Sequence, residues 1–156
     1  KWHIWNITKW RSMGNKQKEI VGVSSSKMDL ITFPDDVKQF VGFALDTAQF
    51  GGKHPDAKPL TNGKLKGKGI FEVVDRFDGD TYRAVYTVKL KDRVYVLHTF
   101  MKKSHKGKAT PQHNIDLISD RYIVAEKIHL ELEAKNPSSI KKYLLKYINK
   151  YLRPAR

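Results

Sequence analysis

Three apolar segments joined by very short turns constrain the fold of this chain more than any other feature. The segments run from about Gly69 to Asp75, from Tyr82 to Lys91 and from Arg93 to Met101. Asp78-Gly79-Asp80 and Lys91-Asp92 supply the turns, and turns this short join neighbouring antiparallel strands. We therefore expect a small, twisted antiparallel sheet in the middle of the chain.

Helical patterns precede this sheet. A first short strand is expected at Glu19–Val23. The capping-box spacing of Ser26 and Asp29 then predicts a short helix over Lys27–Phe33. Within residues 34–51, apolar residues recur at intervals of three and four, which is typical of a helix with one buried face. The chain before the sheet is therefore expected to be a strand followed by a helical hairpin.

Two more helices are expected after the sheet. Residues 53–69 are rich in proline and glycine and indicate a loop before it. Pro111 to about Ala134 has a helical apolar stripe. Asn136-Pro137 begins a last helix, with lysines on one face and Ile140, Leu144, Tyr147 and Tyr151 on the opposite face. The predicted fold class is α+β: a small antiparallel sheet with an N-terminal helical hairpin and C-terminal helices, all packed on one face.

The net charge of the chain limits the classes of molecule that it is expected to bind. Thirty Lys and Arg residues against sixteen Asp and Glu residues give a formal charge of +14, which points to nucleic acid, an anionic membrane or an acidic partner. Residues 57–71 hold four lysines and no acid, and residues 134–156 hold seven basic residues and no acid. Because the charges are segregated, we expect one basic face.

Composition also excludes several classes of chemistry. The chain has no cysteine, so disulfides and thiolate chemistry are excluded. No apolar run approaches the ~20 residues of a membrane span, and Lys1–Trp10 is too short and polar for a signal peptide. We expect a cytoplasmic protein with no membrane partner. No His, Asp and Glu spacing resembles a metal site, and no cofactor is expected.

A basic segment follows the third strand. Lys102 and Lys103 leave the strand directly, and successive strand residues alternate between faces, so only one of them is expected to point into a site. We favour Lys102, although both lysines could instead be solvated. His105 lies in the same segment and is the best histidine candidate for acid–base chemistry. His98 shares strand parity with Val94, Val96 and Phe100 and is expected to be a core residue.

Arg83 is the other catalytic candidate. It lies inside the second apolar segment, where an unpaired charge would be costly. One interpretation is a contact with phosphate, and the other is an ion pair with Glu72 on the neighbouring strand. Both can hold if Glu72 orients Arg83. Tyr82 and Tyr86 are expected on the opposite face as packing residues.

Further residues are candidates for contact with RNA. These are Lys64, Lys66, Lys68, Lys106, Lys108 and Tyr122. The first three are spaced by two, so an extended chain would place them on one side. Tyr122, near the start of the helix after the sheet, could stack on a base.

Several of these pieces follow one another in a recognisable order. They are the helical hairpin around Phe33-Pro34, His54-Pro55-Asp56-Ala57-Lys58-Pro59-Leu60, Gly69-Ile70-Phe71-Glu72-Val73, Tyr82-Arg83-Ala84-Val85-Tyr86, residues 95–104 and Thr110-Pro111. The combination covers about residues 20–125 and resembles the RelE/ParE superfamily of toxins, most closely its HigB-like, phage-derived branch. The resemblance assigns residues 19–135 to a toxin domain. It leaves residues 1–18 as an N-terminal extension and residues 136–156 as a basic amphipathic C-terminal helix.

The resemblance implies the toxin of a type II toxin–antitoxin system. Such a toxin would be a metal-independent endoribonuclease that cleaves mRNA on the ribosome, with a cognate antitoxin of helix-turn-helix type. It would place Arg83 against the scissile phosphate, and Lys102, Lys103 and His105 complete the expected catalytic set. Two alternatives stay open, because one fold can carry several functions. They are a non-catalytic, ParE-like inhibitor of DNA gyrase and a plain nucleic-acid-binding module.

Overall fold

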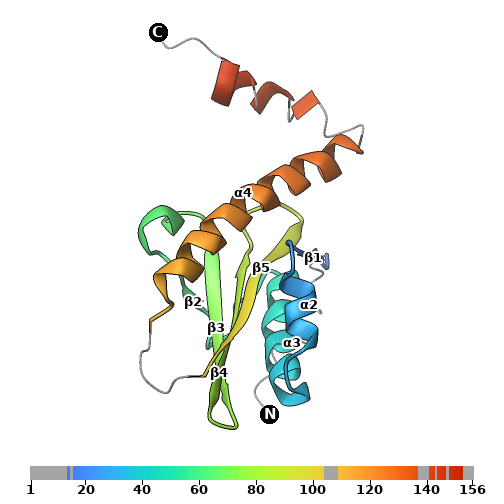
Figure 1. Cartoon of the computed structure of the whole chain (residues 1–156). Helices are drawn as coiled ribbons and strands as arrows, with labels where there is room; N and C mark the ends of the chain where they lie inside the picture. Colours follow the sequence, from blue (N-terminus) through green and yellow to red (C-terminus); the bar gives the residue numbers. More distant parts are fainter. Residues whose placement is uncertain are drawn as a thin grey trace.

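The centre of the molecule is the sheet expected from the short turns (Figure 1). The computed structural model describes residues 14, 16–103, 109–136, 141–142, 144–146 and 148–152. Strands β3 (Ile70–Phe77), β4 (Asp80–Thr87) and β5 (Arg93–Lys102) pair antiparallel in sequence order. The prediction of an α+β fold built on these three strands is confirmed.

Two short edge strands make the sheet five-stranded and mixed. Its strand order is β1-β5-β4-β3-β2. Strand β2 (Lys58–Pro59) pairs antiparallel with β3, whereas β1 (Glu19–Gly22) pairs parallel with β5. The prediction of a purely antiparallel sheet is therefore wrong at β1. The chain leaves β1 for a helical hairpin and returns to its side only in β5, so no short turn indicates the direction of this pair.

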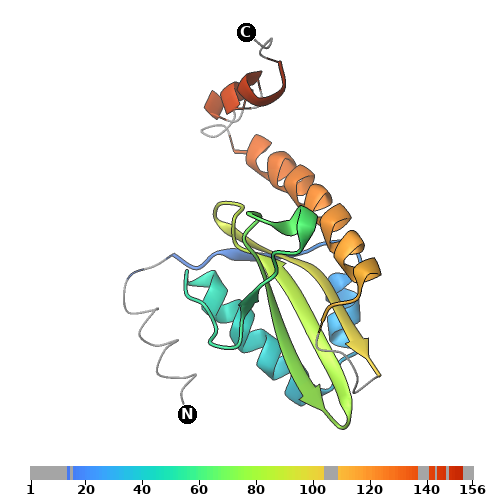
Figure 2. The ribbon, with the colours of Figure 1, turned by 90° about the vertical axis from the view of Figure 1, so that its left-hand side faces the viewer.

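Helices cover both faces of the sheet. Helix α3 (Asp35–Gln49) follows the short α2 (Ser26–Ile31) and packs on one face, and α4 (Gln112–Ala134) packs on the other. Figure 2 shows α3 and α4 on opposite sides of the strands. The expectation that all helices pack on one face is wrong. The physical reason is that both faces of the central strands are apolar, and each apolar face needs a cover.

Successive side chains of β4 point alternately into two hydrophobic cores, one on each face of the sheet. Ala84 and Tyr86 are buried in the core under α3, and Val85 is buried in the core under α4. Tyr86 is 1% exposed, and burial raises its pKa to about 12. The expectation that Tyr82 and Tyr86 are packing residues is confirmed, since Tyr82 packs edge-on against Phe33 with ring centroids 4.9 Å apart.

A β-bulge interrupts the pairing of β4 and β5. Val85 pairs with His98, but the next residue, Tyr86, pairs with Val96, so Leu97 is an extra residue in β5. A bulge of this kind turns two consecutive side chains toward the same face. Leu97 lies in the core under α4, and His98 also contacts α4. The side-chain alternation of β5 therefore changes at Leu97.

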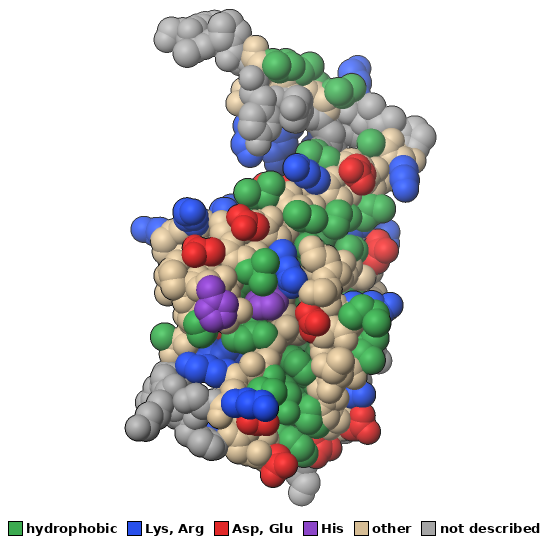
Figure 3. All heavy atoms as spheres, in the orientation of Figure 1, with side chains coloured by type: hydrophobic (Ala, Val, Ile, Leu, Met, Phe, Trp, Pro, Cys, Tyr) green, Lys and Arg blue, Asp and Glu red, His purple; other side chains and the backbone are tan. Residues whose placement is uncertain are grey.

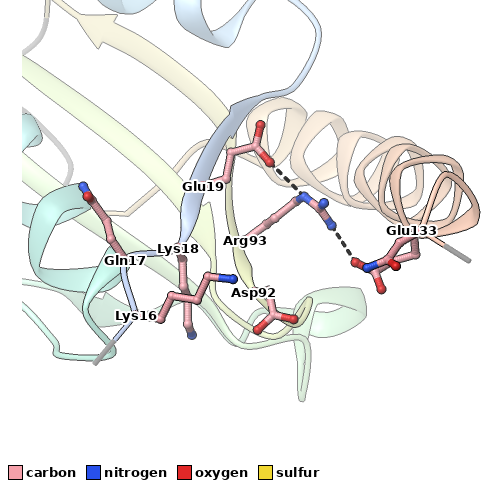
Figure 4. Close-up of a pocket in the computed structure, with 8 residues that line it drawn as sticks. Lys16, Gln17, Lys18, Glu19, Asp92, Arg93 and Glu133 are labelled. Carbon is pink, nitrogen blue, oxygen red and sulfur yellow. Dashed lines mark hydrogen bonds and ion pairs between the residues drawn. The ribbon is translucent and has the colours of Figure 1, made fainter. Parts of the chain in front are cut away.

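The far end of α4 is tied to the sheet by Arg93. Its Nε donates to Glu19 Oε2 at 3.0 Å, and its Nη1 donates to Glu133 Oε1 at 2.8 Å. Figure 4 shows this guanidinium reaching between β1 and α4. Arg93 also lines a surface hollow of about 280 Å³. Tyr95 adds a second tie through a 3.0 Å contact between its hydroxyl and His129 Nδ1. These contacts fix where α4 crosses the strands.

The last part of the chain does not pack on the core in its described residues. Leu144, Leu145, Ile148 and Leu152 are 55%, 54%, 42% and 65% exposed. Residues 148–152 form a π-helical turn. Ile140 and Tyr147, which were expected on the apolar face of this helix, lie outside the described residues. A packing role on the chain's own core is therefore not seen for the apolar side chains that the structure describes.

Candidate functional site

Arg83 lies at the centre of a buried polar cluster on the α4 side of the sheet. Its Nη1 donates to Glu72 Oε1 at 2.9 Å and contacts Thr110 Oγ1 at 3.3 Å. Thr110 Oγ1 also donates to Glu72 Oε1, at 2.5 Å. The side chains of Arg83 and Glu72 are 4% and 11% exposed. The ion pair foreseen as one interpretation of Arg83 is present.

Strand register explains why these two side chains meet. Arg83 pairs with Val74 of β3, and Glu72 stands two residues before Val74. Positions related in this way are diagonal neighbours on one face, within reach of a long side chain. Thr110 arrives from a third segment, two residues before α4 begins. Three parts of the chain therefore hold the guanidinium in one orientation.

The register also separates the two lysines at the end of β5. Arg83 pairs with Phe100, and Lys102 pairs with Thr81, so Lys102 lies two positions from Phe100 on the face of Arg83. Lys102 is half-buried, whereas Lys103 follows the strand and is exposed. The structure therefore brings Lys102 to the face of Arg83 and leaves Lys103 at the end of the strand.

The three lysines before β3 lie in another place. Residues 63–65 form a 3-10 turn, and Gly67 and Gly69 have positive φ angles of 76° and 59°. An extended chain would align Lys64, Lys66 and Lys68, but this segment is not extended, because these turns change the direction of the backbone. The carbonyl of Lys68 accepts a hydrogen bond from Thr87, at the end of β4 remote from Lys102.

The distance between the two groups of lysines follows from strand geometry. Thr81, which pairs with Lys102, and Thr87, which contacts Lys68, are six positions apart along β4. At about 3.3 Å per residue, this separation is roughly 20 Å. The candidate catalytic lysine and the candidate RNA-contacting lysines are therefore two distinct basic areas.

Tyr122 is part of the core and not of an open surface. It is 5% exposed, and the ammonium of Lys68 lies 4.9 Å from the centre of its ring. Burial raises its pKa, and Glu126 adds to that effect. The expected stacking of Tyr122 on a base is contradicted by this burial, because its ring already contacts core residues and Lys68.

His98 is a buried histidine, as expected, but the parity argument for it fails at the bulge. It is 7% exposed and lies under α4, whereas Val96 lies in the core under α3. Its Nε2 is 2.9 Å from Asn114 Oδ1, and its Nδ1 is 3.0 Å from Arg121 Nη1. A guanidinium can only donate. Nδ1 therefore accepts from Arg121, and Nε2 carries the proton that is donated to Asn114.

The electrostatics of His98 agree with a neutral ring. Burial is the largest cause of the lowered pKa of His98. The hydrogen bond to Asn114 raises this pKa, and the charge of Arg121 lowers it. Arg121 also donates to the carbonyl of Leu97 at 3.1 Å and to Ser25 Oγ at 2.8 Å. Sequence reasoning missed Arg121. In the sequence, Arg121 is marked only by its position next to Tyr122, a residue of the apolar helix face.

The remaining candidate residues fall outside the described part of the chain. His105, Lys106 and Lys108 belong to residues 104–108, which the structure does not describe. Among the described residues, no group of His, Asp and Glu could hold a metal ion. Within the same residues, none of the helices combines the length and the apolar character needed to cross a membrane.

Comparison with known proteins identifies the family. No curated protein matches the chain. The crystal structure of the toxin–antitoxin complex RelBE2 from Mycobacterium tuberculosis contains a chain that is 22% identical, with a TM-score of 0.36. The match covers 56% of this chain and 94% of that one. The family model "Phage derived protein Gp49-like (DUF891)" matches residues 28–123, more than half of the chain. The chain therefore belongs to the phage-derived Gp49-like family, a family of RelE-type toxins.

Proposed function

We propose that this protein is a toxin that cleaves mRNA on the ribosome as a metal-independent endoribonuclease. The observation that carries the proposal is the shared sheet face of Arg83 and Lys102. Their register makes them diagonal neighbours, with Cα atoms roughly 7–8 Å apart. Two cations at this spacing can contact one phosphodiester from two sides.

The reaction needs only protein groups. The 2′-hydroxyl of the RNA loses its proton to a base and attacks the adjacent phosphorus. The bond to the 5′-oxygen then breaks, and an acid returns a proton to that oxygen. The products are a 2′,3′-cyclic phosphate and a free 5′-hydroxyl. Cations that contact the phosphorus oxygens stabilise the additional negative charge of the transition state.

Arg83 is assigned to the phosphate oxygens. Its planar fork suits two oxygens of one phosphate, and Glu72 orients it from the neighbouring strand. Because Arg83 is 3% exposed, the Thr110 hydroxyl has to turn aside before a phosphate can reach the guanidinium. The site would then open on contact with the substrate.

The other roles follow from position. Lys102 is a diagonal neighbour of Arg83 on the same face and is assigned as the base or as a second phosphate contact. His105 is assigned as the acid on the basis of the sequence alone. Lys103, Lys106 and Lys108 would hold the neighbouring backbone. Lys64, Lys66 and Lys68 would contact RNA roughly 20 Å farther along the sheet.

The partners follow from the family. As a RelE-type toxin, the protein would act in the cytoplasm, with the ribosome and mRNA as its targets. A cognate antitoxin, expected to be of helix-turn-helix type, would neutralise it.

The test is to add the purified protein to a translating extract and to map the 5′ ends of the mRNA. The proposal expects new ends that depend on ribosomes and are lost with Arg83→Ala. Arg93→Ala is the matched control. Arg93, like Arg83, is a strand arginine in an ion pair, but it lies at the opposite end of β5 from Lys102. The Arg93→Ala variant should keep the cleavage. A folded Arg83→Ala protein with full activity would refute the assignment, and inhibition of gyrase without new mRNA ends would favour the ParE-like alternative.

A further inference from the structure

Arg121 of α4 is a half-buried arginine whose hydrogen-bond partners carry no negative charge. Its guanidinium donates to the carbonyl of Leu97, to Nδ1 of His98 and to the hydroxyl of Ser25. Within the described part of the chain it takes part in no ion pair. Its own helix offers no acid either, since the residues three and four positions away are all apolar. Its positive charge is therefore not balanced by direct contact with any described acid.

The other two arginines that contact the sheet are different. Arg83 is paired with Glu72, and Arg93 is paired with two glutamates. A guanidinium has five N–H donors, and the three hydrogen bonds of Arg121 leave two of them over. One is its Nε–H, which is buried and has no acceptor in the described structure. Because a charge without a partner is costly in a protein interior, an anion from outside the chain would stabilise this arginine.

A carboxylate approaches Arg121 only through a hydroxyl group. Ser25 Oγ accepts from Arg121 Nη2 at 2.8 Å and donates to Asp29 Oδ2 at 2.7 Å. Ser25 is exposed, so the Nη2 end of the guanidinium lies next to the surface. An incoming anion would reach Arg121 at this end. Asp29 would repel the anion from one step farther away.

Strand β5 connects Arg121 to the site assigned to RNA cleavage. His98, which contacts Arg121, stacks on Phe100 with ring centroids 4.7 Å apart, and Phe100 pairs with Arg83. Lys102 follows two positions later on the same face. Each step of two residues is roughly 7 Å along the strand, so the three cations adjoin successive positions of one strand face. Figure 3, which views the molecule from the side of α4, shows histidine side chains with Lys or Arg side chains on both sides of them.

We propose that Arg121 binds a second phosphate of the RNA strand whose scissile phosphate lies at Arg83 and Lys102. The inference rests on the proposed function and adds a contact to the same site. A nucleic-acid backbone repeats its negative charge at short, regular intervals and so suits a row of cations, whereas one carboxylate of a protein partner would use only Arg121. Arg121 touches no reacting atom in this assignment and is a binding residue.

The test is binding of the full chain to a single-stranded RNA of about 10 nucleotides. The RNA is 2′-O-methylated throughout, so it lacks the attacking hydroxyl and cannot be cleaved. Affinity is measured between about 50 and about 200 mM salt. Arg121→Gln should reduce the slope of log K against log salt by about 0.7, the loss of one phosphate contact. Lys127→Gln removes the same charge from an exposed position on the outer side of α4 and should leave the slope unchanged.

Arg121→Lys separates phosphate binding from a structural role. Lysine keeps the charge but not the planar fork that contacts Leu97 and His98. Thermal unfolding should therefore shift downward in both Arg121 variants, whereas only Arg121→Gln should lose salt dependence. If Arg121→Lys loses as much of the slope as Arg121→Gln, the role of Arg121 is structural and the proposal is overturned.

A second variant leaves Arg121 in place and decides the matter even if Arg121→Gln does not fold. Asp29→Asn removes the carboxylate beyond Ser25, so affinity for the RNA should rise by about 3-fold at low salt. Asp120→Asn, on the outer side of α4, removes the same charge from an exposed position and should raise the affinity less. An Asp29→Asn protein that gains no more affinity than Asp120→Asn would overturn the proposal.

Mapping of mRNA ends in the translating extract distinguishes this inference from the proposed function. If wild-type protein cleaves mRNA and Arg121→Gln keeps the full salt slope, the inference fails and the proposed function stands. If wild-type protein makes no new ends but the slope depends on Arg121, the nuclease assignment fails and the phosphate contact stands. A loss of affinity for an oligo-aspartate peptide, with RNA binding unchanged, would assign Arg121 to an acidic protein partner and overturn the proposal.

Discussion

Arg83 of β4 and Glu72 of β3 form a 2.9 Å ion pair across the strands, and water reaches little of either side chain. Removing two charges from water is costly unless they are paired closely. The pair therefore fixes the direction of the guanidinium. It also makes each partner dependent on the other, because a single substitution leaves a charge in the protein interior.

We predict that Arg83→Met lowers the free energy of unfolding by about 3–5 kcal/mol, since it leaves Glu72 without its cation. The double variant Arg83→Met, Glu72→Met should lose less than the sum of the two single variants. Urea unfolding of all four proteins measures the coupling. Lys38→Met is the control, because its pair with Asp35 is exposed to solvent and should contribute little to stability. Additive losses would show that the pair is not coupled.

Lys102 and Lys103 should differ in effect although they are neighbours. Lys102 lies on the face of Arg83, and Lys103 lies beyond the strand. Lys102→Ala is expected to reduce the rate of mRNA cleavage by about 100-fold or more, as for other lost transition-state contacts. Lys103→Ala should mainly weaken RNA binding and flatten its dependence on salt. Cleavage rates at saturating substrate separate the two effects, and equal losses in both variants would argue against the assignment.

Stability should fall when the pH drops below neutrality. Burial lowers the pKa of His98 and of His129 below the ordinary 6.5 of an unfolded chain. Between the folded pKa and 6.5 the unfolded chain binds more protons, so the free energy of unfolding decreases as the pH falls through this window. Unfolding curves at pH 7 and pH 5 should therefore differ less in His98→Gln than in wild type. An unchanged pH dependence in that variant would mean that His98 does not contribute.

Removing residues 137–156 should leave a folded core. The described apolar side chains of this part are about half exposed, so little packing is lost and the unfolding free energy should change by no more than about 1 kcal/mol. The deletion also removes six basic residues, so affinity for ribosomes should decrease and become less sensitive to salt. Thermal unfolding and ribosome pelleting measure the two effects. An insoluble product would instead assign the segment to core packing.

The central strands and the helices were predictable because local signals determine them. The turn after β3 contains Asp78 and Gly79 with positive φ angles of 48° and 79°, conformations that these residue types favour. Arg83 and Glu72 were also predictable as a pair, since short turns set the register of their strands. Local sequence patterns were therefore sufficient to predict contacts between neighbouring strands.

The parts that were not predictable depend on contacts between distant segments. The nitrogen of Val23 donates to the carbonyl of Val96 across 73 residues, and no local pattern indicates the parallel pairing that continues into this bond. Arg121 was missed for the same reason, because an arginine on a helix is usually solvated and its partner His98 comes from strand β5, 23 residues earlier in the chain. The glycines at positions 67 and 69 already indicated in the sequence that the run of lysines need not be extended.

The extra residue Leu97 determines toward which face of the sheet Lys102, at the end of β5, points. Before it, odd-numbered side chains such as Tyr95 lie under α4; after it, even-numbered ones such as His98 lie there. A strand that places more side chains on one face than on the other must bend or twist at that point. The orientation of Lys102 is thereby governed by a buried leucine, a residue that no motif for phosphate binding or proton transfer would include.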